Sequence, residues 1–162
     1  MTRITRHTTL FFDASVLVAG VHSVSGGSGL LLAACQAGGF RAQVTSAVLL
    51  EALHALKGSP QQHLSRFRQL LIGIKWELLP VPPAQTLEHY HQYISAKDVH
   101  VLAAAVEGKA EFLLTLDRQH ILAVAEVVKE AGLPITILRP GDFIRHYYPQ
   151  HEDYPVLPPA RG

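Results

Sequence analysis

The chain has 162 residues, of which 48% are hydrophobic and 17% charged, and its formal net charge is +1 at pH 7. This length and composition indicate one globular domain with a single core, and the small charge neither requires nor excludes a nucleic-acid partner. The lone cysteine, Cys35, excludes an internal disulfide and a cysteine-rich zinc site, which fits a reducing cytosol.

The first part of the chain predicts two strands and two helices. TLFF, at 9–12, predicts a strand, and a helix starts directly after Asp13. A break at HSVSGGSG follows, and Ser28 is expected to cap the next helix, in which Cys35 is a buried and inert thiol. FRAQVT, at 40–45, predicts the second strand.

The middle of the chain predicts two more helices and a third strand. SAVLLEALHALKG has the pattern of a helix with Ser46 as its N-cap and Gly58 just past its end. Pro60 opens a further helix, PQQHLSRFRQLLIGI, whose apolar residues recur at helical spacing. WELLPV, at 76–81, predicts the third strand, which the following prolines end.

The remaining expected elements are, in chain order, helices near 84–94 and 96–108, a strand at 111–116, a helix over 118–132 opened by Asp117, a strand at 135–138 and a short helix at 141–148. Uniformly apolar strands separated by helices predict an α/β fold with a parallel sheet covered on both faces. Residues 1–148 are expected to form one domain, and the Pro-rich segment 149–162 an extended or disordered tail. No apolar run is long enough to span a bilayer, so we expect a cytoplasmic protein without a membrane partner.

Four acidic residues stand in informative places, and each has an ordinary structural explanation. Asp13 and Asp117 both lie between an apolar strand and a helix, where an N-cap carboxylate stabilises by about 1 kcal/mol. Asp98 follows Ser95 by three residues, as in a capping box. Glu51 fits a solvated position on its helix.

Taken together, the four acids point to a ligand site. Sites in parallel α/β sheets form beyond the carboxyl ends of the strands, where Asp13 and Asp117 are expected. Asp98 begins the helix that leads to the fourth strand, and Glu51 has a partly apolar helix face beside it. Converging carboxylates about 4 Å apart repel by about 4 kcal/mol at an effective dielectric near 20, so such a cluster must take up protons or bind a cation. Oxygen ligands without Cys or a well-spaced His pair suit Mg²⁺ or Mn²⁺.

Basic residues flank these acids. Lys97, Arg118 and His120 are candidates for contacts with phosphate, and ordinary solvated charge is the alternative for Lys97 and Arg118. His100 and His120 are expected at the surface or in packing rather than as metal ligands.

With these acids in place, the sequence resembles the PIN-domain ribonucleases, in particular the VapC-like toxin components of bacterial toxin–antitoxin pairs. The resemblance covers roughly residues 8–147, in the segments FFDASVLVAG, TSAVLLEALHAL, KDVHVLAAAVEGKAEFLLTLDRQHIL and ITILRPGDFIRHY. The third segment is the most specific, because it joins Asp98 to the signature Thr115–Leu116–Asp117.

This resemblance implies a PIN-like fold, with a five-stranded parallel sheet between helices, and metal-dependent hydrolysis of RNA phosphodiester bonds. It implies that Thr115 positions a carboxylate or a water and that Ser15 has a weaker supporting role. It further implies an RNA substrate, an antitoxin protein partner and a homodimer. The residues that it marks as catalytic and as ligands of Mg²⁺ or Mn²⁺ are Asp13, Glu51, Asp98 and Asp117.

Two other functions compete with the ribonuclease. A catalytically silent PIN-like module would bind RNA or protein, but such a member should have lost acids that are all present here. A phosphatase of the haloacid-dehalogenase type also begins with a strand and an Asp, but it needs a second Asp where this chain has Ser15. His100 departs from the family pattern, because its place is usually apolar.

Overall fold

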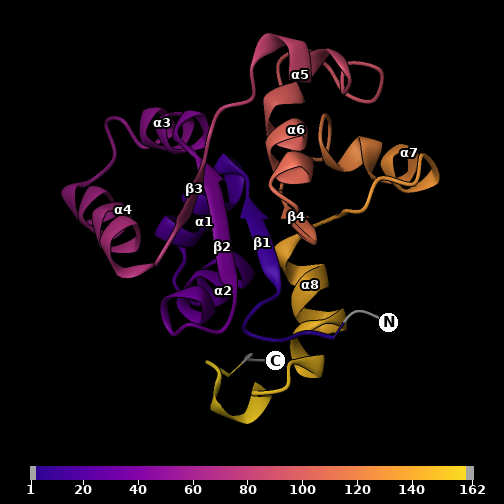
Figure 1. Ribbon diagram of the computed structural model, residues 1–162. Helices are drawn as coiled ribbons and strands as arrows, with labels where there is room; N and C mark the ends of the chain where they lie inside the picture. The colour runs from indigo at the N-terminus through magenta and orange to yellow at the C-terminus, as the bar shows by residue number, and fades with distance from the viewer. Residues whose placement is uncertain (1–2, 160–162) are drawn as a thin grey trace.

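In the computed structural model, which describes residues 3–159, five parallel strands form one sheet in the order β3-β2-β1-β4-β5 (Figure 1). The α/β fold with a five-stranded parallel sheet expected from the sequence is therefore confirmed. The strands are β1 Thr9–Phe12, β2 Arg41–Thr45, β3 Glu77–Leu79, β4 Phe112–Leu114 and β5 Thr136–Leu138.

The helices lie on both sides of this sheet. The chain moves from β1 through β2 to β3 in one direction across the sheet and from β4 to β5 in the other. Since parallel crossovers are right-handed, the helices of these two halves cover opposite faces, as α1–α4 and α5–α7 do in Figure 1. The helices are α1 Ala14–His22, α2 Gly27–Gln36, α3 Ser46–Ala55, α4 Gln61–Gly73, α5 Ala84–Glu88, α6 Val99–Glu107, α7 Ala125–Glu130 and α8 Pro140–His146.

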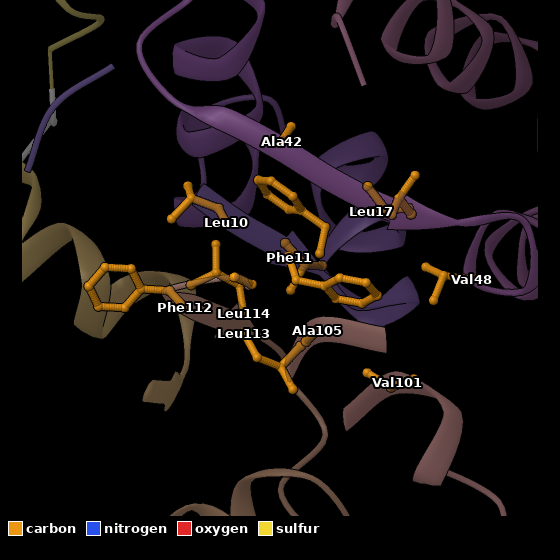
Figure 2. Packing of buried hydrophobic residues seen from close by; sticks show 14 of the residues in the cluster. Leu10, Phe11, Leu17, Ala42, Val48, Val101, Ala105, Phe112, Leu113 and Leu114 are labelled. Carbon is orange, nitrogen blue, oxygen red and sulfur yellow. The ribbon is translucent and has the colours of Figure 1, made fainter. Parts of the chain in front are cut away.

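The central strands form the core because both of their faces are covered. Every residue of β1 and β4 is buried, as expected for parallel strands between two helical layers. Figure 2 shows Leu10 and Phe11 of β1 close to Leu113 of β4, with Val101 and Ala105 of α6 packed nearby. This packing brings the start of α6 toward the strands that carry two of the acids.

No single helix in the described part of the chain is long and apolar enough to cross a membrane. Helices α1 and α2 together reach the required length and composition, but they are bent by 97° relative to each other. Gly29 allows the close approach of the chain at this bend, because an added Cβ would lie 2.4 Å from the Val24 carbonyl oxygen. Both helices contribute buried residues to the core.

Two helix caps differ from the sequence-based expectation. Thr45, not Ser46, caps α3: its Oγ1 accepts a hydrogen bond from the Val48 N–H at 3.2 Å, because Thr45 keeps the extended backbone of β2. Gly26 takes the N-cap position of α2, and Ser28 lies buried inside the helix. The buried Cys35 is as expected, and burial raises the pKa of its thiol.

The expected continuous helix over 118–132 is wrong. Only Ala125–Glu130 is α-helical, preceded by a 3₁₀ helix at Leu122–Val124 and by turns. Asp117 stabilises the first turn, because its Oδ1 accepts hydrogen bonds from the N–H groups of Gln119 and His120. Ile121, the next residue, is buried. The chain thus folds tightly against the sheet edge before the helix begins.

The C-terminal segment also differs from the extended or disordered tail that we expected. Residues 148–156 contain two short 3₁₀ helices, Tyr148–Gln150 and Tyr154–Val156. The buried His151 places Nε2 2.7 Å from the Gly39 carbonyl oxygen, and the Glu152 N–H donates to the Ile4 carbonyl oxygen at 3.0 Å. These contacts join both ends of the domain, while residues 160–162 of the expected tail lie outside the described residues.

Candidate functional site

The sheet register places Asp13 beside the loop that follows β4. Phe12 pairs with Leu114 at the ends of the two neighbouring strands, and the Asp13 N–H donates to the Leu114 carbonyl oxygen at 3.0 Å. The residue after Leu114 is Thr115, so it is the next neighbour of Asp13 at the carboxyl edge of the sheet. This is the edge at which parallel sheets bind ligands.

Asp13 is buried, at 5% exposure, and two hydroxyl groups hold it. Ser15 Oγ donates to Asp13 Oδ2 at 2.7 Å, and Thr115 Oγ1 donates to the same oxygen at 2.8 Å. Asp13 occupies the N-cap position of α1, yet within residues 3–159 its side chain makes no capping hydrogen bond and Oδ1 accepts none. Helix capping therefore does not explain this acid.

Thr115 connects the first acid to the last. The buried Oγ1 that donates to Asp13 also accepts the Asp117 N–H at 3.1 Å. Ser15 Oγ accepts the Leu116 N–H at 3.0 Å, so it fastens the same loop from the side of α1. The hydroxyls of Ser15 and Thr115 therefore connect the chain after β1 to the loop after β4 by hydrogen bonds.

Asp98 and Asp117 approach from the other half of the fold. Asp98 is 7% exposed at the start of α6, where Ser95 Oγ donates to its Oδ2 at 3.3 Å; its side chain forms no capping hydrogen bond with any residue that the structure describes. Asp117 is half-buried and caps its own turn. The capping explanation thus holds for Asp117 and not for Asp98.

A pocket of about 510 Å³ collects the acids from four separate segments. Ser15, Lys97 and His22 also contribute to its wall, whereas Arg118 is exposed outside it. The structure therefore brings together all four acids that the sequence singled out, and of the three basic candidates it places Lys97 in the pocket wall. The acids in its lining are Asp13, Glu51, Asp98 and Asp117.

The pocket perturbs the titration of Glu51. Partial burial raises the pKa of its carboxyl above the usual value, and the negative charges of Asp13 and Asp98 raise it further. His100 and Lys97 act in the opposite direction and lower it. The charges of Asp13 and Asp98 thus add to the effect of burial on the pKa of Glu51, as expected where carboxylates converge on one pocket.

Two histidines also lie at the site. Sequence reasoning did not place His22 there, and it named His120 as a candidate for phosphate contact and not as a partner of Asp117. His22 ends α1 and lines the pocket, with its ring centroid 4.8 Å from that of His63. His120 has Nδ1 3.2 Å from each carboxylate oxygen of Asp117. The spacing of three residues after Asp117 was visible in the sequence, but only the turn directs this ring at the carboxylate.

The chain matches the PIN domain family over residues 9–119. It resembles the crystal structure of VapBC2 from Rickettsia felis bound to a DNA fragment from their promoter, with 15% identity and a TM-score of 0.50, over 81% of this chain and 98% of that chain. It also resembles the crystal structure of PAE2754 from Pyrobaculum aerophilum, with 18% identity and a TM-score of 0.49, over 68% of this chain and 76% of that chain. Comparison with curated proteins gives no match.

The family match covers β1 through β4 and the turn after β4, and so includes all four acids of the pocket. The likeness to VapBC2 concerns the fold, and it extends over most of both chains. The resemblance to the PIN-domain family drawn from the sequence is thereby confirmed. The chain belongs to the PIN domain family, whose members are generally nucleases.

Proposed function

We propose that this chain is a metal-dependent endoribonuclease, and that it acts as the toxin of a toxin–antitoxin pair. One observation carries the proposal: four carboxylates from separate segments line one pocket, and two of them, Asp13 and Asp98, are more than nine-tenths buried. A fold that gathers buried negative charges without pairing them loses stability. A divalent cation compensates those charges.

The side chains in the pocket fit Mg²⁺ or Mn²⁺. Both ions favour carboxylate oxygens, and the Oδ1 atoms of Asp13 and Asp98 accept no hydrogen bond from residues 3–159. When bound, such an ion polarises a phosphate oxygen and lowers the pKa of a coordinated water. We assign the ligand role to Asp13, Glu51, Asp98 and Asp117.

The remaining residues orient these ligands and receive the substrate. Ser15 and Thr115 bond one oxygen of Asp13, which directs the other toward the pocket. Lys97 stands in the pocket wall, where its ammonium group attracts an RNA phosphate. Arg118 is exposed next to Asp117 and contacts the RNA backbone beyond the pocket.

The partners follow from the same proposal. RNA is the substrate, an antitoxin protein is the inhibitor, and the active form is a homodimer. Support comes from the PIN domain match and from the fold shared with the VapBC2 structure. Capture of RNA requires no membrane attachment.

The test is cleavage of a labelled single-stranded RNA by the purified chain with Mg²⁺, with Mn²⁺ and with EDTA. We expect cleavage with either ion, none with EDTA, and a loss of roughly a hundredfold or more in Asp13→Asn. Asp153→Asn, the same change at an exposed acid outside the pocket, should keep full activity. RNA binding without cleavage under every condition would overturn the proposal in favour of the catalytically silent module.

A further inference from the structure

The ring of His120 lies within reach of two of the four acids. One of its nitrogens and one carboxylate oxygen from each of Asp98 and Asp117 all lie within 4.8 Å of one another. Two ligands on opposite sides of one ion, each about 2.1 Å from it, are about 4.2 Å apart. The three side chains are therefore spaced for a single cation after a small closure.

Asp98 supplies a second and independent observation. Its side chain is 7% exposed and lines the pocket. Within the described residues its carboxylate accepts one hydrogen bond, from Ser95 Oγ to Oδ2, so Oδ1 has no partner. A carboxylate in a residue this deeply buried, with a single hydrogen bond, is costly unless a cation or a proton compensates its charge.

The turn after Asp117 holds the His120 ring in place. The His120 N–H donates to Asp117 Oδ1 at 3.1 Å, and Nδ1 lies 3.2 Å from both oxygens of the same carboxylate. The nitrogen is thus presented on the same side as the carboxylate oxygens.

We propose that His120 is a nitrogen ligand of the cation held by Asp98 and Asp117, and that it shifts the preference of the site from Mg²⁺ toward Mn²⁺ and Co²⁺. This inference rests on the proposed metal site and specifies which ions it selects. An imidazole nitrogen favours first-row transition ions, whereas Mg²⁺ prefers oxygen ligands and retains water. The other two acids of the pocket, Asp13 and Glu51, offer oxygen alone.

The direct test is pulsed electron paramagnetic resonance of the full chain loaded with Mn²⁺, which detects a bound imidazole through the coupling of its nitrogen nucleus to the ion. We expect the coupling in the unaltered chain and its loss in His120→Asn. Asn keeps a hydrogen-bonding group near Asp117 but has no ring nitrogen, so a mere positioning role would survive this change. His91→Asn, the same change at an exposed histidine, is the matched control and should keep the coupling.

Two other histidines near the acids must be distinguished from His120 as the source of a nitrogen coupling. His22 stands nine residues after Asp13 on α1, about 13 Å along the helix axis, too far to share an ion with it. His100 lies close enough to Glu51 to lower the pKa of its carboxyl, so the spectrum is also recorded for a second variant, His100→Asn. Loss of the coupling in His100→Asn and its persistence in His120→Asn would overturn the assignment.

Calorimetric titration with each ion measures the selectivity. His120→Asn should weaken Co²⁺ and Mn²⁺ binding by roughly tenfold or more, with the larger loss for Co²⁺, and change Mg²⁺ binding much less. Equal losses for the three ions would show that His120 only positions Asp117, and would overturn the inference.

The same measurements distinguish this inference from the proposed function. Mn²⁺ that binds in an Asp117-dependent manner, without any nitrogen coupling, would overturn the role of His120 and leave the metal site standing. Failure of the unaltered chain to bind any of the three ions would overturn both.

Discussion

Asp13 and Asp117 have almost the same sequence context and very different surroundings. Each follows a short apolar strand, and each precedes a segment with a helical pattern. Asp13 is buried and held by hydroxyls from α1 and from the loop after β4, while Asp117 is half-buried and bonds the backbone of its own turn. The difference teaches that one acid depends on tertiary packing and the other on local structure, although both line one pocket.

The largest expected effect tests what the two acids share. Mn²⁺ at about a hundred times its Kd should stabilise the unaltered chain by about 2.7 kcal/mol, because the ion binds only the folded state. Asp13→Asn and Asp117→Asn should each abolish this stabilisation, measured by thermal unfolding with and without Mn²⁺, and Asp153→Asn should retain it. Stabilisation that survived in either pocket variant would separate that acid from the metal site.

The link between the two acids is the next test. Thr115→Val removes the donor to Asp13 and the acceptor for the Asp117 N–H while keeping the side-chain shape, so it should cost about 2 kcal/mol in denaturant unfolding. Metal affinity should fall by roughly tenfold or more, because the ligand loses its orientation. Thr115→Ser keeps the hydroxyl and should restore most of both quantities; if it behaved like Thr115→Val, packing rather than hydrogen bonding would be responsible.

A smaller effect separates local capping from ligand function. In EDTA, Asp117→Ala should lose about 1 kcal/mol of unfolding free energy, because its turn loses the side-chain acceptor, whereas Asp117→Asn should lose little. Both variants should fail to bind Mn²⁺. Equal stability of Asp117→Ala and the unaltered chain in EDTA would contradict the capping role.

The smallest effect concerns the pH dependence of the metal-free protein. The pKa of Glu51 is raised in the folded state, so its contribution to stability is fully present below the unfolded pKa of about 4.3 and is lost as the pH rises through the folded pKa. Glu51→Gln should therefore match the unaltered chain near pH 4 in EDTA and become the more stable of the two at higher pH. With saturating Mn²⁺ the order should reverse. A difference in EDTA that did not change with pH would remove the electrostatic explanation.

The strands were predictable because a parallel strand covered on both faces must be apolar throughout. TLFF matches β1 in full, and the other four strands fall within the predicted segments, whose ends lie no more than two residues from the observed ones. Strand ends depend on where the neighbouring strand stops supplying hydrogen-bond partners. That information is not local to the segment.

The helices were less predictable at their first residues. The segment after Asp117 has helical apolar spacing, and its carboxylate accepts from the N–H groups of Gln119 and His120 as a helix N-cap does. The Leu122 N–H, however, donates to the Asp117 carbonyl oxygen at 2.9 Å, and the chain continues as turns and a 3₁₀ helix. Thr45 caps α3 in place of Ser46, since the capping residue must keep the extended backbone of the strand. Both residues were reasonable caps from composition alone.

The sequence by itself determined the order of the elements, the apolar strands and the identity and spacing of four acids, because these depend on residue type and local periodicity. Tertiary structure alone decided that Asp98 reaches the pocket and that Asp13 is held from a loop a hundred residues away. The physical reason is that sheet register and helix packing bring together groups whose separation along the chain carries no distance information.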